Sequence, residues 1–212
     1  MKILIIGGSG FLGSYVADEL FRKGHKVILF DKKKSKRANK KIKIIIGDIQ
    51  NHFILKKAIK GVDVVYNFAA IADIGEALRK PIQTVKTNIL CVVNILEICK
   101  KYKIKRFVFA SSIYVHSQQG GFYRASKQAA ELYIEEYSKQ HGLNYTILRF
   151  GTVYGPRADV RNNLSRIISG AIKTGTVKYR GTSRAVRRFI HVKDAAKASV
   201  DILKGKFVNK IY

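Results

Sequence analysis

A short apolar segment followed at once by a glycine-rich turn constrains the fold of this chain more than any other feature. Residues 2–6 read Lys-Ile-Leu-Ile-Ile, and the stretch Gly7–Gly13 continues directly as Gly-Gly-Ser-Gly-Phe-Leu-Gly. Helical periodicity then covers residues 11–23. A strand, a tight turn of small residues and a helix in this order are typical of the first unit of a parallel α/β sheet. The opening loosely imitates a signal peptide, but the run is short and no cleavage-like pattern follows, so we predict a buried strand.

The alternation of strand and helix continues through the first 150 residues. Apolar, β-branched runs predict strands at residues 26–30, 42–46, 63–68, 106–110 and 145–150. Helical patterns lie between them at residues 51–60, 82–102 and 123–141, the second starting after Pro81 and the third closed by Gly142. Continuous apolar strands separated by helices imply a parallel sheet covered on both faces. We therefore expect an α/β fold, a Rossmann-type doubly wound parallel sheet.

The pattern changes after residue 151. Residues 151–157 have the composition of a turn-rich loop. The elements expected beyond it are a helix at 163–173, strands at 176–179 and 188–191, a helix at 193–204 and a final strand at 207–212. This irregular region predicts a small C-terminal lobe beside the sheet.

Size and composition fit one packed domain with a small appendage. The chain has 212 residues, of which 47% are hydrophobic, and we find no apolar run long enough to span a bilayer. Cys91 and Cys99 fall in one predicted helix and offer neither a disulfide framework nor metal-ligand spacing. We expect buried free thiols in a cytoplasmic protein without a metal site.

The formal net charge of +27 is extreme. A basic surface can bind nucleic acid or an acidic membrane, and it can equally reflect a lysine-rich proteome. The lysines are scattered over most predicted helices and loops, and no nucleic-acid motif accompanies them. The densest run, Lys32 to Lys43, is most simply a solvated loop. We therefore expect no specific nucleic-acid partner and no membrane partner.

The glycine turn suits a bound pyrophosphate. Small residues let the backbone approach the phosphates, and the N-terminus of the following helix attracts negative charge. The spacing of Gly7, Gly10 and Gly13 differs from the G-x-G-x-x-G of many dehydrogenases, but its place between a strand and a helix favours cofactor binding. We expect cofactor contacts from these glycines and from Phe11 and Leu12.

Two acids follow the second and third predicted strands. Asp31 stands about 20 residues after the turn, where a carboxylate can bind the adenosine ribose and repel a 2′-phosphate, which favours NAD over NADP. Lys32, which begins a run of three lysines, weakens that preference because these side chains could stabilise a phosphate. Asp48 and Ile49 are placed to touch the adenine, although Asp48 could instead cap the helix at residues 51–60.

A serine, a tyrosine and a lysine lie where a parallel sheet binds its ligands. Ser112 follows the fifth predicted strand, and Tyr123 and Lys127, four residues apart, share one face of the next helix. A nearby ammonium and a positively charged nicotinamide would both favour the phenolate of Tyr123, whose pKa is ordinarily about 10. Tyr123 could then act as a general base while Ser112 holds the reacting oxygen. The alternative is a tyrosine that merely packs on the sheet.

The combined motifs resemble those of the extended short-chain dehydrogenase/reductase family, within its NAD-dependent epimerase/dehydratase group. The resemblance runs through nearly the whole chain. It rests on the stretches Gly7–Gly13, Asp31, Gly47-Asp48, Asn67–Ala70, Asn88, Ala110–Ser112, Tyr123–Lys127, Leu148–Arg157 and Arg187–Asp194.

The resemblance implies roles for further residues. Ala69 and Ala70 would line the nicotinamide side of the cleft, and Lys127 would also bond the nicotinamide ribose. Phe150 and Val153 would flank the cofactor or the substrate entry. Arg187 would contact the diphosphate of a nucleotide sugar. Asn88 would stabilise the fold near the site.

Departures from the family pattern narrow the chemistry. Dehydratases of the family usually carry an acidic residue directly after the catalytic Ser or Thr, whereas this chain has Ile113 and Tyr114. Elimination of water is therefore disfavoured, and so is the decarboxylation that uses a nearby glutamate. His116-Ser117 replaces the usual Tyr-Gly, and counting back from Val115 favours Ser112 over Ser111 as the acting serine.

The resemblance also implies a domain division and an activity. Residues 1–155 would form the NAD-binding domain, and residues 156–212 a partial substrate-binding lobe interleaved with the last sheet elements. Family members usually continue past a segment like Lys210-Ile211-Tyr212, so we expect this lobe to be incomplete, whether the short form is natural or not. The implied activity is that of a UDP-hexose 4-epimerase, which removes and returns hydride through a keto sugar.

Alternatives remain open at this point. They are a nucleotide-sugar dehydrogenase or reductase, a non-catalytic NAD-binding protein, and association with nucleic acid through charge alone. A homodimer could form through the helices at 82–102 and 123–141, although their apolar residues are equally explained by packing on the sheet.

Overall fold

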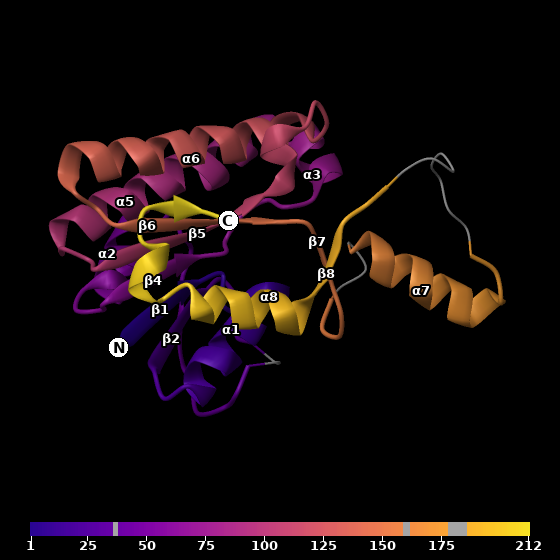
Figure 1. Cartoon of the computed structure of the whole chain (residues 1–212), viewed down its shortest axis with the longest axis horizontal. Helices are drawn as coiled ribbons and strands as arrows, with labels where there is room; N and C mark the ends of the chain where they lie inside the picture. Colours follow the sequence, from indigo (N-terminus) through magenta and orange to yellow (C-terminus); the bar gives the residue numbers. More distant parts are fainter. Residues whose placement is uncertain (36–37, 159–161, 178–185) are drawn as a thin grey trace.

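A parallel sheet of seven strands organises the part of the chain that the structure describes. The computed structural model describes residues 1–35, 38–158, 162–177 and 186–212 (Figure 1). The strand order is β3-β2-β1-β4-β5-β6-β9, and every neighbouring pair is parallel. The strands are β1 (Lys2–Ile6), β2 (Lys26–Asp31), β3 (Lys43–Ile46), β4 (Val64–Asn67), β5 (Arg106–Ser112), β6 (Tyr145–Phe150) and β9 (Lys210–Ile211). The predicted doubly wound parallel sheet is thus confirmed, and residues 2–6 form a buried strand.

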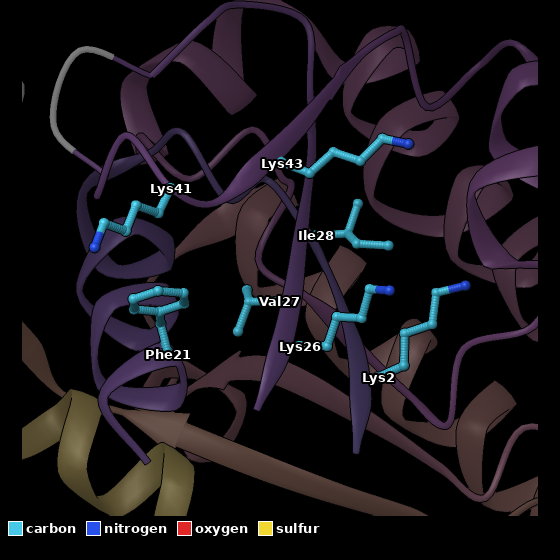
Figure 2. Close-up of a pocket in the computed structure, with 7 residues that line it drawn as sticks. All are labelled: Lys2, Phe21, Lys26, Val27, Ile28, Lys41 and Lys43. Atoms are coloured by element: carbon cyan, nitrogen blue, oxygen red, sulfur yellow. The ribbon is translucent and has the colours of Figure 1, made fainter. Parts of the chain in front are cut away.

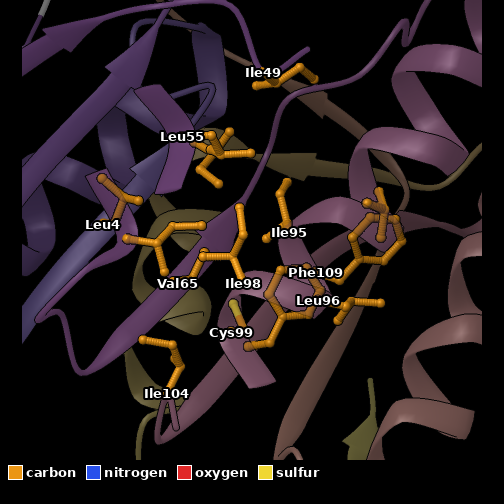
Figure 3. Packing of buried hydrophobic residues seen from close by; sticks show 14 of the residues in the cluster. Leu4, Ile49, Leu55, Val65, Ile95, Leu96, Ile98, Cys99, Ile104 and Phe109 are labelled. Carbon is orange, nitrogen blue, oxygen red and sulfur yellow. The ribbon is translucent and has the colours of Figure 1, made fainter. Parts of the chain in front are cut away.

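Helices cover both faces of this sheet (Figure 1). On one face lie α2 (His52–Ile59), α5 (Cys91–Lys101) and α6 (Gly121–His141), whose apolar side chains pack with Leu4 and Phe109 of the strands. Figure 3 shows this core, in which Ile95 and Leu96 of α5 meet the strand residues. On the other face lie α1 (Phe11–Arg22) and α8 (Val192–Asp201). Two apolar layers therefore hold the sheet rigid beneath its loops.

The strand order places a crevice between β1 and β4. The chain proceeds outward from β1 to β2 and β3, then returns to the other side of β1 as β4 and continues to β5 and β6. Ligands of open parallel sheets bind beyond the carboxyl ends of the strands where the order reverses. The loops after β1, β4 and β5 all begin at the carboxyl ends of the strands, on this side of the sheet.

A smaller sheet extends from the main one. The loop predicted at 151–157 contains a strand, β7 (Thr152–Tyr154), which pairs in parallel with β8 (Phe189–His191). The prediction of a turn-rich loop missed this strand, because β7 depends on a partner distant in sequence. Helix α7 (Asn163–Thr174) stands away from the main body in Figure 1.

The helical region predicted at 82–102 is interrupted and begins earlier. Helix α3 (Ile74–Arg79), which was not predicted, precedes α4 (Pro81–Val85), and a π-helical segment η1 (Lys86–Leu90) joins α4 to α5. The continuous helical stretch Pro81–Lys101 is long and apolar enough to span a membrane, which corrects the statement that no such run exists. Half of its most apolar window is buried, and its side chains form core, so it is a core helix here.

Several C-terminal elements differ from the prediction. Helix α8 ends at Asp201, and a 3₁₀ turn (Gly205–Phe207) precedes the two-residue strand β9, so the expected strand at 207–212 is much shorter. Residues 176–177 of the strand expected at 176–179 are not in a strand, and the rest lies outside the described residues. Because β9 pairs with β6 and α8 packs against α1, the end of the chain belongs to the main body.

Candidate active site

The turn between β1 and α1 is packed so tightly that side chains are excluded. A Cβ atom added to Gly13 would lie 2.4 Å from the carbonyl oxygen of Gly7, and one added to Gly7 would lie 2.6 Å from the backbone nitrogen of Ala69. Gly7 also has a φ of 79°, which disfavours other residues. Helix α1 therefore starts directly over the end of β1, beside the loop that follows β4.

The N-terminus of α1 is suited to bind an anion. Gly10 is its N-cap and has no side chain to bond the first N–H groups, and the first turn, which begins with Phe11 and Leu12, carries no acid. The first backbone N–H groups of a helix lack partners within the helix and attract phosphate. The observed cradle thus fits the pyrophosphate of a dinucleotide.

Replacing Gly10 by alanine tests this cradle. The new Cβ would lie 3.2 Å from the carbonyl oxygen of Gly7, which the fold can accommodate at a cost of about 1 kcal/mol. The methyl group would stand where the backbone must approach a pyrophosphate, so we expect NAD affinity to fall at least about tenfold by calorimetry. Gly170→Ala in α7, where the structure shows open space, is the matched control and should leave affinity unchanged. Equal affinities for the two variants would contradict a phosphate site at this turn.

Asp31 lies against the glycine turn, as a ribose-binding carboxylate should. Its Oδ2 accepts a hydrogen bond from the backbone N–H of Ser9 at 3.0 Å, and its Oδ1 accepts one from Lys33 at 3.3 Å. The end of β2 is thereby fixed beside the start of α1. The carboxylate stands between the turn and the solvent-exposed lysines that follow it.

Asp48 does not cap the next helix. Asn51 is the N-cap of α2 and accepts from the backbone N–H of Ile54, so the alternative reading of Asp48 as a cap was wrong. Asp48 instead forms a salt bridge with Lys32 at 3.0 Å. Burial raises the pKa of Asp48, but hydrogen bonds from Gln50 and Lys32 outweigh burial and leave the pKa below its usual value. Its role at the adenine stays a prediction.

Three other residues were predicted to contact the cofactor, and they lie in two different places. Ile49 is buried in the apolar cluster beneath α2, whereas Ala69 and Ala70 are half-buried after β4. Ala69 donates its N–H to the side chain of Asn67 at 3.1 Å. The Asn67 amide nitrogen is buried without a hydrogen-bond partner among the described residues. A polar group left over at this edge is compatible with a polar ligand nearby.

The structure brings Ser112, Tyr123 and Lys127 together. Ser112 ends β5, and its hydroxyl accepts from the backbone N–H of Tyr114 at 3.3 Å at the start of a 3₁₀ turn (Ile113–His116). Tyr123 and Lys127 both lie on the buried face of α6, and the Lys127 ammonium is 5.8 Å from the centre of the Tyr123 ring. The side chain of Ser112 is near enough to the Tyr123 phenol to lower its pKa. The expected shared helix face is therefore present.

The electrostatics of Tyr123 differ from the expectation. Burial raises the pKa of Tyr123 above its usual value, and Tyr114 raises it further, while the nearby side chain of Ser112 lowers it. Lys127 does not point its charge at the phenol, because its Nζ donates to the carbonyl oxygen of Ala110 at 2.7 Å and lies 4.5 Å from the centre of the Phe109 ring. Burial lowers the pKa of Lys127 to about 8.

Asn88 connects the elements around this site without reaching the phenol. Its amide exchanges two hydrogen bonds with the backbone of Ile71, at 2.8 and 3.0 Å, and donates to the hydroxyl of Ser126 at 2.9 Å. Asn88 lies in the π-helical segment and is 1% exposed. It joins the loop after β4 to α6, so its side chain stabilises the fold near Tyr123.

Asn88→Ala should therefore destabilise the protein strongly. The substitution leaves the backbone groups of Ile71 buried without their partners, which costs about 2–4 kcal/mol. Urea denaturation measures the change. Asn94→Ala, on the exposed side of α5, should change stability by less than about 0.5 kcal/mol. A loss for Asn88→Ala no larger than that control would show that these hydrogen bonds contribute little.

A cavity of about 300 Å³ lies beyond the ends of β5 and β6. The residues that line it include Ile113, Arg149, Phe150, Gly151, Arg188, Phe189 and Tyr212. Arg149 forms an ion pair with the buried Glu131 of α6, and a second nitrogen of its guanidinium contacts His116. The Glu131 partner raises the pKa of Arg149.

Sequence reasoning missed this ion pair. The available signal was a charged residue inside the otherwise apolar strand at 145–150, which in a buried strand calls for a partner. The identity of that partner depended on the fold. Glu131 lies on α6, one turn beyond Lys127, so the pair also fixes the helix that carries the catalytic residues.

Of the remaining predicted residues, Phe150 is closest to the catalytic set. Phe150 pairs with Ser112 across β5 and β6. Val153 lies in β7 opposite Ile190 of β8, and Arg187 is exposed in the segment that leads into β8. The structure brings Phe150 to the edge of the site, and the roles of Val153 and Arg187 stay predictions.

Comparisons with known proteins agree with this arrangement. The profile of the NAD dependent epimerase/dehydratase family matches residues 3–212. A protein of Methanocaldococcus jannaschii described as a candidate UDP-glucose 4-epimerase is 31% identical, with 96% of this chain aligned to 74% of that protein. A UDP-N-acetyl-alpha-D-glucosaminuronate decarboxylase of Bacillus cytotoxicus is 30% identical, with 99% of this chain aligned to 73% of its length.

Solved structures give the same result. The UDP-glucose 4-epimerase of Thermotoga maritima with UDP-glucose superposes with a TM-score of 0.91 at 28% identity, over 100% of this chain and 76% of that one. The UDP-glucose 4-epimerase of Thermus thermophilus with NAD gives a TM-score of 0.88 at 28% identity, over the same shares of the two chains. The match over nearly all of its length, together with the glycine turn and the Ser112–Tyr123–Lys127 set, shows that this chain belongs to the NAD-dependent epimerase/dehydratase family, whose cofactor is NAD.

Proposed function

We propose that the chain is a nucleotide-sugar 4-epimerase of the UDP-hexose type, acting in the cytoplasm. The observation that carries the proposal is the set of Ser112, Tyr123 and Lys127 at the end of β5 without an acid directly after the serine. Ile113 and Tyr114 occupy the two positions where an eliminating enzyme would carry its acid. Oxidation and return of hydride need a hydride acceptor such as NAD and a group that moves the hydroxyl proton, but no such acid.

Each residue has a distinct task in this proposal. Ser112 holds the C4 oxygen of the sugar by a hydrogen bond, and Tyr123 accepts the proton of the C4 hydroxyl as its general base. NAD, when bound, would accept the hydride from C4 and later give it back. The sugar passes through a C4 ketone, and Tyr123 returns the proton after the opposite face of that ketone receives hydride.

Tyr123 needs help to lose its proton. Burial raises its pKa in the protein alone, so the phenol is protonated near neutral pH. A positive charge brought into the cleft favours the phenolate, and NAD carries such a charge on its nicotinamide ring. The ammonium group of Lys127, 5.8 Å from the centre of the Tyr123 ring, would add a second positive charge while it holds the nicotinamide ribose.

The region from 156 to 212 is proposed to bind the sugar nucleotide, with residues 1–155 as the NAD-binding domain. Support comes from the cavity beyond β5 and β6, whose lining includes Arg188. Arginine binds phosphate well because its planar head donates in pairs. Arg187 is exposed and directly precedes Arg188 in the sequence, and it is proposed to contact the diphosphate.

A homodimer is part of the proposal. Exposed apolar side chains gather on α3, α4 and α6, including Leu78, Ile82 and Leu132. Such side chains on adjoining helices favour association. Light scattering should give about twice the mass of one chain.

The experiment that tests the proposed activity is incubation with a panel of UDP-, GDP- and dTDP-sugars plus NAD, with the products identified by NMR. The expected result is a C4 epimer without net formation of NADH. A stoichiometric requirement for NAD or NADH would favour a dehydrogenase or reductase instead. Loss of carbon dioxide or of water from the sugar would contradict the argument from Ile113 and Tyr114.

A further inference from the structure

A groove lined by lysines lies at the edge of the sheet opposite the active site. Lys2 and Lys26 begin β1 and β2, and Lys41 and Lys43 lie at the start of β3. Together with Phe21, Val27 and Ile28 they line a hollow of about 300 Å³, which we call the lysine groove (Figure 2). Because Lys2 stands five residues before Gly7, the groove lies about 16 Å from the cofactor turn along β1.

The strand register gathers three of these ammonium groups on one face. Lys2 and Lys26 are direct partners across the parallel strands, and Lys43 is the partner of Ile28, two residues beyond Lys26. Side chains two residues apart in a strand share a face. Figure 2 shows the ammonium groups of Lys2, Lys26 and Lys43 extending toward the same side. Like charges on directly opposed residues repel and destabilise a sheet.

These charges lack an acidic partner in the described part of the chain. Among the described residues, no carboxylate lies within 4 Å of the ammonium group of Lys2, Lys26, Lys41 or Lys43. Asp63, beside Lys2 at this edge, accepts from the Lys2 backbone and pairs with Lys105 instead. Several other lysines, such as Lys80 and Lys100, do have acidic partners on their own helices.

The floor of the groove is apolar. Val27 and Ile28 are buried, and the half-buried ring of Phe21 lies beside them. Figure 2 places Phe21 and Lys41 on one side of Val27, with the other three lysines beyond it. The hollow is small, about 300 Å³, so it suits a small multivalent anion better than a long polymer that follows a stripe of charge.

We infer that the lysine groove binds an oligophosphate, either inorganic or carried by a nucleotide. The phosphates would meet the ammonium groups of Lys2, Lys26 and Lys43, which extend from one face of the sheet. A base, if present, would stack on Phe21. This site is separate from the pyrophosphate cradle at Gly7–Gly13, so NAD and the oligophosphate bind together.

Calorimetry with inorganic tripolyphosphate tests the inference, in the presence of saturating NAD and at about 0.1 M salt. We expect one saturable site in the unaltered chain and at least about tenfold weaker binding by the double variant Lys26→Gln, Lys43→Gln. The matched control, Lys139→Gln with Lys204→Gln, removes the same charge from exposed positions and should change affinity less than about twofold. Thermal melting of both variants checks that they remain folded.

Three outcomes would overturn the inference: no saturable binding, equal weakening by the two double variants, or displacement of tripolyphosphate by NAD. A second arm with ATP, again with saturating NAD, identifies the source of the phosphates. ATP that binds more tightly than tripolyphosphate, with the difference removed by Phe21→Leu, supports a nucleotide in the groove. Equal affinities that Phe21→Leu does not alter support an inorganic oligophosphate.

Discussion

Replacing Tyr123 by phenylalanine should lower epimerase turnover by about 10²–10⁴-fold while NAD affinity stays within about twofold. The substitution removes the phenol oxygen and leaves the ring that contacts Tyr114 in place. Without that oxygen the C4 hydroxyl has no group to accept its proton as hydride leaves. Initial rates with the substrate found by NMR, and calorimetry with NAD, measure the two effects separately.

Tyr133→Phe provides the matched control. Tyr133 lies on the same helix, α6, and is 48% exposed, so the same atom is removed from a position outside the site. Its turnover should equal that of the unaltered chain. If Tyr123→Phe left the activity of the protein unchanged while Gly10→Ala abolished it, the function would be binding of NAD rather than chemistry.

Lys127→Met should make the protein more stable and less active. Burial lowers the pKa of Lys127 from 10.5 to about 8, which corresponds to about 3 kcal/mol of cost for holding the charged form in the folded state. Loss of the hydrogen bond to Ala110 offsets part of this, so the free energy of unfolding should rise by about 1–2 kcal/mol at pH 7. Turnover should fall at least about tenfold, because the positive charge near Tyr123 and the proposed contact to the nicotinamide ribose are lost.

The pH dependence of this gain follows from the direction of the pKa shift. Between about pH 8 and 10 the unfolded chain holds the Lys127 proton and the folded chain releases it, so the stability contributed by Lys127 rises with pH in that window. The advantage of Lys127→Met should therefore shrink from pH 7 to pH 9.5 in urea denaturation. Lys139→Met, an exposed change on the same helix, should show no such trend. An advantage that is constant with pH would contradict the assigned cost of burying the charge.

The main sheet could be predicted because its signals are local. Each strand from β1 to β6 is built around a short run of apolar residues, and the turn at Gly7–Gly13 and the closing Gly142 mark helix ends by their backbone requirements. Helix α3 was missed although a local signal existed. Asp73 caps it by accepting from the backbone N–H of Glu76, and an acid followed three residues later by glutamate is a known start signal.

Other features depended on partners distant in sequence. Strand β7 exists through pairing with β8, and the π-helical segment η1 contains Asn88, whose hydrogen bonds reach Ile71 and Ser126. No local pattern encodes these contacts.

The candidate site shows the same division. The i, i+4 spacing of Tyr123 and Lys127 predicted their shared face, and the end of β5 predicted the place of Ser112. The direction of the Lys127 ammonium toward Ala110 could not be predicted, because it depends on where β5 meets α6. The ion pair of Arg149 with Glu131 required the same knowledge.

The most direct test of the proposed epimerase uses UDP-glucose that carries deuterium at C4, incubated with the purified chain and NAD. Because the hydride is removed and returned within one cleft, the account predicts UDP-galactose with deuterium retained at C4 and no net NADH, observed by NMR and by absorbance. Product with protium at C4, NADH formed in proportion to product, or unchanged UDP-glucose would contradict it.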